Sequence, residues 1–389
     1  MNIIDDIRAR QGELSRIRRD IHAYPELAFN EHRTGDVIAR HLEALGIETH
    51  RGIGRTGVVG VIRAGSSPRA IGLRADMDAL PITERNTFEH CSRHAGRMHA
   101  CGHDGHTTML LGAAEYLAKH RNFDGTVVLI FQPAEEGEGG APAMLADGLL
   151  ERFPFEMVFG MHNWPGLPVG SFGVFPGPVM ASSDQWEIHL HGRGAHAAMP
   201  QQGLDPIVAG AALVQSLQSL ITRTRDPLEP AVLSVTQFHA GEAYNAIPDR
   251  AYLMGTVRAL SHHERDRLEH AIGVVTDGIA AAHGVRAEYT YRRGYPPTIN
   301  DAVAAAVCAQ AAAKVAGATG VLANLRPSMG AEDFAYFAQA RPGCYVWIGN
   351  GPGEGGCTLH NPNYDFNDEA LPIGASYWVR LVETALAPA

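Results

Sequence analysis

The sequence predicts an α/β protein whose mixed, mostly parallel sheet is flanked by helices and interrupted by a smaller inserted α+β domain. Strand-like runs alternate with helix-like stretches in the N-terminal part of the chain, and the alternation returns before the C-terminus. A middle segment instead has the order β-α-β-β-α-β, which is typical of a ferredoxin-like unit. The length of 389 residues also exceeds the usual size of one domain.

The N-terminal part is expected to begin with an amphipathic helix, because its apolar residues recur at helical spacing from Ile3 to Ile21. Further helices are expected at 34–45, 107–120 and 141–150. Strands are expected at 58–62, 70–73, 126–131 and 157–161. This alternation predicts a largely parallel sheet covered by helices.

The middle segment has its own pattern of six elements. Strands are expected at 186–190, 232–238, 252–257 and 286–291, with helices at 206–222 and 263–283. After Pro296 and Pro297 the α/β pattern returns, with helices at 303–315, 331–338 and 374–386 and a strand at 344–348. We therefore expect a catalytic domain of residues 1–184 plus 297–389 and an inserted domain of residues 185–296.

The composition excludes several classes of protein. The formal net charge is −10, which argues against a nucleic-acid partner. The two lysines, Lys119 and Lys314, lie in helix-like stretches, so a phosphate-binding P-loop is not expected. Apolar runs are strand-sized, so no membrane span is expected. Five scattered cysteines and an N-terminus without a signal-peptide pattern predict a cytoplasmic protein.

Three stretches combine residues that can bind metal ions. Residues 99–106 contain Cys101 and three histidines, residues 132–138 contain Glu135 and Glu136, and His162 follows Met161. The second and third stretches come directly after predicted strands, where ligands bind in α/β sheets. A thiolate, imidazoles and a carboxylate together form a suitable donor set for a divalent metal ion.

Each stretch alone has an ordinary explanation. The Cys-x-His pair in residues 99–106 can have a structural role, and the glutamate pair in residues 132–138 can lie on a solvated surface. His162 can be a polar residue whose hydrogen bonds are satisfied within the protein. A catalytic Cys101 acting with a nearby histidine is an alternative. The glycines from Gly52 to Gly57 match a dinucleotide-binding pattern, but a predicted strand follows them instead of a helix, so we expect a turn. Neither a G-x-S-x-G nor an H-E-x-x-H motif is present.

The sequence resembles the metal-dependent aminoacylase, carboxypeptidase and amidohydrolase family, within it the subgroup of hippurate hydrolases and indole-acetyl-amino-acid hydrolases. Seven ordered motifs spread over nearly the whole chain carry this resemblance: residues 22–27, 73–81, 99–106, 132–138, 192–196, 330–334 and 359–362. It implies hydrolysis of the amide bond of N-acyl amino acids such as hippurate. A metal-dependent exopeptidase or dipeptidase on the same scaffold is the alternative, and a non-catalytic binding protein a more distant one.

The resemblance also implies roles for individual residues. The metal ligands would be Cys101, His103, Glu136, His162 and His360, with Cys101 bridging two divalent ions of zinc, manganese, nickel or cobalt. Glu135 would be the general base. Asp76 and Asp104 would orient ligands without binding the ions, although a plain structural role is equally compatible with the sequence.

The inserted domain is implied to be a lid and a dimerisation surface, so a homodimer or higher homo-oligomer is expected. His196 would stabilise the oxyanion, in some relatives across a dimer interface. Asn245 and Arg258 would bind the substrate carboxylate. Subgroup members often have a further histidine where Gln201 stands, so fine details of the lid can differ.

Overall fold

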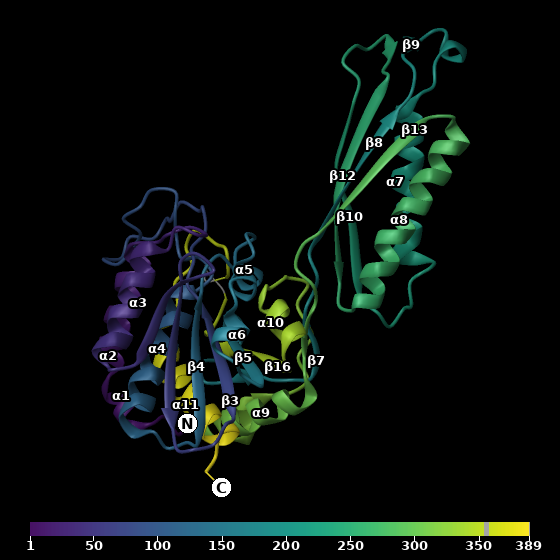
Figure 1. Cartoon of the computed structure of the whole chain (residues 1–389). Coiled ribbons are helices and arrows are strands. Elements are labelled where there is room, and N and C mark those ends of the chain that lie inside the picture. The colour runs from purple at the N-terminus through teal and green to yellow at the C-terminus, as the bar shows by residue number, and fades with distance from the viewer. Residues whose placement is uncertain (354–357, 389) are drawn as a thin grey trace. The chain divides into compact units, whose positions relative to one another are not determined.

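The computed structural model describes residues 1–353 and 358–388, which form two compact units. Unit 1 comprises residues 1–177, 299–326 and the chain from Asp333 onward, and unit 2 comprises residues 178–298 and 327–332. Figure 1 shows an α/β fold in unit 1 and a four-stranded sheet with two long helices in unit 2. The predicted fold class, with its ferredoxin-like insertion, is therefore confirmed.

Unit 1 contains an eight-stranded sheet in the order β1-β2-β4-β3-β5-β16-β6-β15. Its four central strands run parallel to one another, and they are β4 (Gly125–Gln132), β3 (Ala70–Asp76), β5 (Met157–Trp164) and β16 (Gly343–Gly349). The outer strands are β1 (Glu48–Ile53), β2 (Gly57–Ala64), β6 (Phe172–Gly173) and β15 (Val321–Leu322). A separate two-stranded sheet is made of β7 (Gly177–Met180) and β14 (Thr298–Asn300). The carboxyl ends of the central strands therefore share one edge of the sheet.

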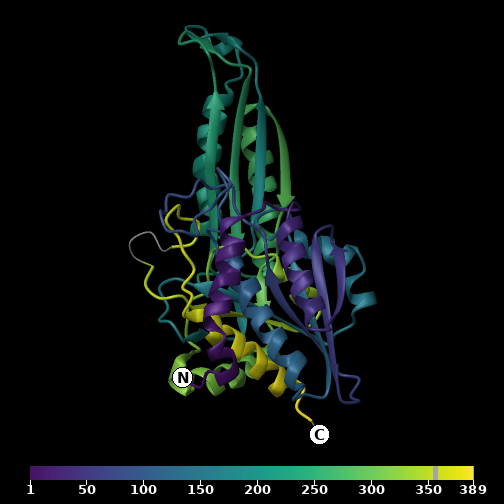
Figure 2. The same ribbon diagram turned by 90° about the vertical axis from the view of Figure 1, so that its left-hand side faces the viewer.

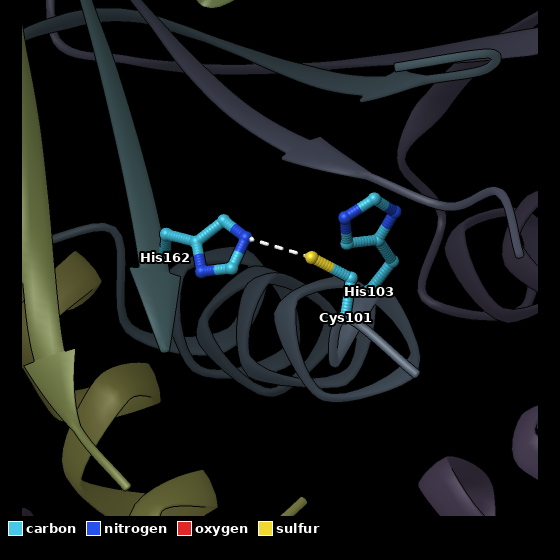
Figure 3. Close-up of side chains that lie close together, drawn as sticks. All are labelled: Cys101, His103 and His162. Atoms are coloured by element: carbon cyan, nitrogen blue, oxygen red, sulfur yellow. Dashed lines mark hydrogen bonds between the residues drawn. The ribbon is translucent and has the colours of Figure 1, made fainter. Parts of the chain in front are cut away.

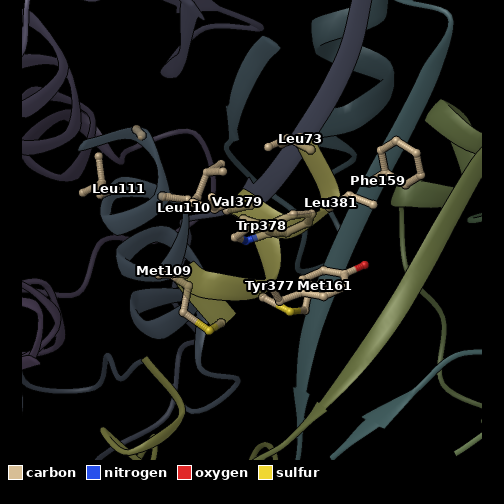
Figure 4. Packing of buried hydrophobic residues seen from close by; sticks show 14 of the residues in the cluster. Leu73, Met109, Leu110, Leu111, Phe159, Met161, Tyr377, Trp378, Val379 and Leu381 are labelled. Atoms are coloured by element: carbon tan, nitrogen blue, oxygen red, sulfur yellow. The ribbon is translucent and has the colours of Figure 1, made fainter. Parts of the chain in front are cut away.

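Helices cover this sheet because its central strands are apolar on both faces, and every residue of β3 and β16 is buried. The helices of unit 1 are α1 (Asp5–Ala9), α2 (Gln11–Ala23), α3 (His32–Ala44), α4 (His103–His120), α5 (Gly140–Ala146), α6 (Leu149–Arg152), α9 (Ala302–Ala316), α10 (Phe334–Ala340) and α11 (Ala370–Ala385), with the short 3₁₀ helix η2 (Ala318–Gly320). Helices α2, α4 and α11 pack against one another (Figure 2). Figure 4 shows Trp378 of α11 and Leu73 of β3 in the shared core, where both are almost fully buried.

Local differences from the predicted elements have identifiable causes. The first helix is divided at Arg10, so that α1 and α2 are separate. Strand β1 was not predicted, because its alternating polar residues resemble a loop. Residues 54–56 form the turn between β1 and β2, and Gly52 and Gly54 have positive φ angles of 75° and 60°. The expected turn at these glycines is confirmed.

Unit 2 is an antiparallel sheet in the order β10-β12-β8-β13. Its strands are β8 (Asp184–His191), β10 (Ala231–Ala240), β12 (Arg250–Ala259) and β13 (Arg286–Arg293), and its helices are α7 (Pro206–Thr222) and α8 (His262–His283). A small sheet pairs β9 (Ala195–His196) with β11 (Ala246–Ile247), next to the 3₁₀ helix η1 (Pro200–Gln202). The fully buried Trp186 lies in the unit's own apolar core, so unit 2 does not depend on unit 1 for a core.

A buried ion pair fixes one end of the sheet of unit 2. Asp184 accepts hydrogen bonds from Arg265 at 2.8 and 2.6 Å, from the Tyr291 hydroxyl at 2.7 Å and from the Gly294 backbone at 3.0 Å. Both charged side chains are nearly inaccessible to water.

No helix in residues 1–353 or 358–388 is both long and apolar enough to cross a membrane.

Asp184→Ala is expected to lower the free energy of unfolding by about 3–5 kcal/mol, because it leaves the buried Arg265 without its carboxylate. Urea unfolding followed by circular dichroism measures this loss. The matched control is Asp277→Ala on the exposed face of α8, for which a change within about 0.5 kcal/mol is expected. Equal effects of the two substitutions would contradict the assigned importance of the pair.

Candidate metal centre

The predicted metal ligands of unit 1 lie at the shared edge of the sheet. Glu135 and Glu136 follow the end of β4, and His162 lies near the end of β5. Cys101 comes just before α4, and His103 is the first residue of that helix. This is the edge where α/β proteins bind ligands.

The side chains of all five predicted ligands approach one another, although they come from distant parts of the chain. The Cys101 Sγ atom lies 3.4 Å from His162 Nε2, and Figure 3 shows His103 beside this pair. Glu136 Oε1 lies 3.2 Å from His360 Nε2 and 4.0 Å from His103 Nε2. Among the predicted ligands and Glu135, three triads have ligand atoms within 4.8 Å of one another, and they are Cys101–His103–His162, Cys101–Glu136–His360 and His103–Glu135–Glu136. Two further triads in the described residues meet the same criterion, Asp76–His103–His106 and Glu135–Glu332–Asp333.

The donor set fits a divalent cation. His103 Nε2 is buried and has no hydrogen-bond partner, while its neighbours at 3.8 and 4.0 Å are oxygens of Asp76 and Glu136. A buried imidazole nitrogen without a partner costs free energy unless something binds it. A cation bound by His103 and Glu136 would remove that cost.

Gly102 permits the close approach of the two ligands on either side of it. Its φ is 90°, a left-handed conformation that favours glycine. A Cβ atom here would lie 2.3 Å from Asn163 Nδ2 and 2.5 Å from the Tyr364 hydroxyl. The Asn163 amide donates to the carbonyl of Cys101 at 2.6 Å, so the ligand-bearing turn packs directly against the end of β5.

Asp78 orients two ligands at once, a role that the sequence did not indicate. Its carbonyl and its Oδ1 accept from His103 Nδ1 at 2.9 and 3.1 Å, which directs Nε2 of this ring towards Glu136. Its Oδ2 accepts from the backbone N–H of Glu136 at 2.9 Å. The spacing of Asp78 from Asp76 in the motif 73–81 was the available signal.

Asp76 hydrogen-bonds His106, and its Oδ2 also lies 3.8 Å from Nε2 of the predicted ligand His103. Its Oδ1 accepts from His106 Nδ1 at 2.6 Å, so His106 Nε2 is free to accept from the backbone N–H of Asn163 at 2.9 Å. His162, the neighbour of Asn163, is thereby fixed with its own Nε2 facing Cys101. Sequence reasoning missed His106 and Asn163, although both lie inside the stretches that it singled out.

Asp104 points away from the predicted ligands. Its Oδ2 accepts from His22 Nδ1 at 2.8 Å and from Arg18 at 3.4 Å, and all three side chains are buried. Arg18 also donates to Asp365 and Asp368 at 2.7 and 2.8 Å. Asp104 therefore connects the first turn of α4 to α2 and to the segment before α11.

The electrostatics argue against the alternative of a nucleophilic Cys101. Burial raises the pKa of its thiol well above the usual value, and the carboxylates of Glu136 and Glu135 raise it further. A thiolate nucleophile instead needs cationic surroundings that lower the pKa. A bound cation would stabilise the thiolate as a ligand.

The remaining predicted site residues lie in unit 2, in two separate places. His196 and Asn245 are adjacent, because β9 pairs with β11 and the Ala197 N–H donates to the Asn245 carbonyl at 3.0 Å. This pair lies near the Arg250 end of β12, while Arg258 lies near its other end. At about 3.4 Å per residue, the eight steps between Arg250 and Arg258 span roughly 27 Å.

The comparisons with known proteins agree with this geometry. The sequence matches peptidase family M20/M25/M40 over residues 72–384. It is 43% identical to a hippurate hydrolase of Campylobacter jejuni over 98% of each chain, and 41% identical to the IAA-amino acid hydrolase ILR1-like 2 of Arabidopsis thaliana over 93% of this chain and 82% of that protein. The Bacillus subtilis YXEP protein, described as a dinuclear metal binding peptidase from the M20 family, is similar in structure with a TM-score of 0.86 and 36% identity, over 97% of this chain and 99% of that one.

The ion pair of His22 makes stability depend on pH. Burial lowers the pKa of His22, but Asp104 and Glu84 outweigh this effect and raise it from 6.5 to about 9. The stabilisation is fully present below pH 6.5 and is lost as the pH rises through 9. We expect the difference in unfolding free energy between wild type and His22→Gln to shrink by up to ~3 kcal/mol between these pH values. Urea unfolding of chelator-treated proteins measures it, and a difference independent of pH would contradict the assignment.

Proposed function

The chain belongs to peptidase family M20/M25/M40, and from this membership we propose that it hydrolyses the amide bond of N-acyl amino acids, releasing a carboxylic acid and a free amino acid. The observation that supports the proposal best is the convergence of five residues that can bind metal ions at one edge of the sheet, with Glu135 beside them. The five residues are Cys101, His103, Glu136, His162 and His360.

Two divalent ions fit this arrangement better than one, because the triads overlap without coinciding. Cys101 belongs to two triads, which suits a bridging thiolate. The structurally similar YXEP protein is described as binding two metals. The thiolate and imidazole donors favour zinc, nickel or cobalt over calcium and magnesium, and the carboxylates also suit manganese.

When bound, the ions lower the pKa of water and polarise the scissile carbonyl. Glu135 lies within reach of His103 and Glu136, and it accepts a proton from the attacking water. The water oxygen then forms a bond to the acyl carbon, the C–N bond breaks, and Glu135 donates the proton to the leaving amine. Asp76 and Asp104 orient neighbouring groups without contacting the substrate.

The substrate class follows from the relatives and from the predicted carboxylate contacts. The names of two relatives describe hydrolases of hippurate and of IAA-amino acids. Arg258 and Asn245 suit the free carboxylate that N-acyl amino acids carry. An exopeptidase or dipeptidase activity is the second candidate, because YXEP is described as a peptidase.

A cytoplasmic location also stays a prediction, and a thiol ligand suits a reducing compartment.

The geometry of unit 2 favours a homodimer. His196 lies near the Arg250 end of β12, and Arg250 is roughly 27 Å from Arg258 along this strand, so His196 and Arg258 are not expected to contact one small substrate from the same chain. A second copy of the chain resolves this conflict if His196 and Asn245 of one protomer serve the catalytic centre of the other. The inserted domain of residues 185–296 then acts as both lid and dimerisation domain of a catalytic domain made of residues 1–184 and 297–389.

Glu135→Ala is expected to retain metal but to lower kcat by about 10²–10⁴-fold, because it removes the proton carrier. The protein is first depleted of metal, and each divalent ion is then added back. Turnover is measured with hippurate, N-acetyl amino acids and dipeptides, and the amount of bound metal is measured separately. The control is Glu138→Ala, an exposed glutamate in the same loop, with unchanged turnover expected. Unchanged turnover of Glu135→Ala would refute the role, and faster cleavage of dipeptides would favour the peptidase.

Mixing two inactive variants tests the dimer. Glu135→Ala and His196→Ala are each expected to be inactive, whereas subunits exchanged between them form mixed dimers with one complete centre. Random exchange should restore activity to about one quarter of the wild-type sites. Size-exclusion chromatography with light scattering reports the dimer. An absence of recovery after demonstrated exchange would show that His196 acts within its own chain.

A further inference from the structure

The loop that carries Glu135 contains an unusual backbone conformation immediately before this residue. Ala134 has a φ of 52°, in the left-handed region, although it is not glycine, and it is fully buried. An L-residue keeps such a conformation only where its surroundings impose it. The Ala134 carbonyl accepts from the Gly140 N–H at 2.9 Å, which closes the loop between β4 and α5.

A buried glutamate from a distant part of the chain binds the backbone N–H of the same residue, Ala134. Glu31, immediately before α3, accepts a hydrogen bond from the Ala134 N–H at 2.9 Å through Oε1. Its Oε2 accepts from the Thr56 hydroxyl at 2.6 Å, so both oxygens are occupied and the carboxyl is fixed. Glu31 has no accessible surface and is not a predicted ligand.

A second buried carboxylate acts on the residue after Glu135. Asp78 accepts from the Glu136 N–H at 2.9 Å and from His103. The residues before and after Glu135 therefore each donate their backbone N–H to a buried acid, Ala134 to Glu31 and Glu136 to Asp78. Asp78 also orients the proposed ligand His103, whereas the side chain of Glu31 hydrogen-bonds Ala134 in the loop and Thr56.

We propose that Glu31 is a positioning residue that imposes the left-handed conformation of Ala134 and thereby directs the Glu135 carboxylate towards His103 and Glu136. This inference rests on the proposed role of Glu135 as the general base. Without Glu31, Ala134 relaxes towards negative φ, and the side chain that follows it changes direction. A displacement of about 1 Å at a catalytic group can lower turnover about 100-fold.

The negative charge of Glu31 is not required for this role. Burial raises its pKa to about 7, although Thr56 and the Ala134 N–H stabilise the carboxylate. A glutamine at this position can accept from the Ala134 N–H through its carbonyl oxygen and donate to Thr56 through its amide. Glu31→Gln therefore preserves the contact that Glu31→Ala removes.

Four metal-loaded variants separate positioning from general stability, assayed with the N-acyl amino acid that wild type hydrolyses fastest. Glu31→Ala is expected to lower kcat by about 10- to 100-fold with KM and bound metal within about twofold of wild type. Glu31→Gln should keep kcat within about threefold. The double variant Glu31→Ala/Ala134→Gly should recover much of the loss, because glycine adopts positive φ without strain.

The matched control is Glu26→Ala. Glu26 also accepts two backbone N–H groups at the start of α3, from Arg33 and Thr34 at 3.0 and 2.8 Å, whereas the Ala134 N–H is bound by Glu31. Glu26→Ala should lower the thermal midpoint without changing kcat. If Glu26→Ala and Glu31→Ala lower kcat equally, or if glycine at position 134 restores nothing, the positioning role is overturned.

Crystal structures of the metal-free variants provide a readout independent of turnover. A positive φ at residue 134 is expected in wild type, Glu31→Gln and the double variant, and a negative φ in Glu31→Ala. An unchanged positive φ in Glu31→Ala would overturn the proposal even if its activity fell. If wild type hydrolyses no N-acyl amino acid, the proposed function fails, while the φ angle still decides whether Glu31 governs the loop.

Discussion

The buried guanidinium of Arg74 connects the parts of unit 1 that carry the metal centre. It donates to Asp76 at 2.7 Å, to the Gln132 side chain at 2.7 Å and to Asp333 at 3.1 Å, and it has no accessible surface. These partners lie on β3, at the end of β4 and at the start of α10. Because an unpaired buried charge is very costly, the three elements can adopt essentially one mutual arrangement.

Asp333 extends this network to the loop that carries Glu135, the proposed general base. It accepts from the Gln132 side chain at 2.8 Å and from the Ala141 N–H at 2.8 Å, on the two sides of the loop between β4 and α5. On the other branch, Asp76 leads through His106 to the end of β5. The guanidinium of Arg74 thus fixes both strand ends that present the proposed metal ligands. Its positive charge also explains how the carboxylates of Asp76 and Asp333 remain close together.

Much of this architecture could be predicted from the sequence. Apolar runs of strand length and helical periodicity are local signals, so the α/β pattern and the βαββαβ order of unit 2 were accessible. The ligand stretches were accessible because they follow strands. The partners Arg74, Asp78, His106 and Glu31 were not assigned roles, because a buried polar contact between distant residues leaves no periodicity in the chain. Likewise, the separation of His196 from Arg258 became visible only with the pairing of β12.

The left-handed turn at Gly102 has a consequence for how this centre can diverge. Any side chain at position 102 would collide with Asn163 and Tyr364, so the spacing between the donors at positions 101 and 103 is frozen. The chemical nature of the donor at position 101 is under no such backbone restriction. Evolution or a designer can therefore retune the ion preference of the centre by exchanging the side chain at position 101 while the spacing of the two donors is kept.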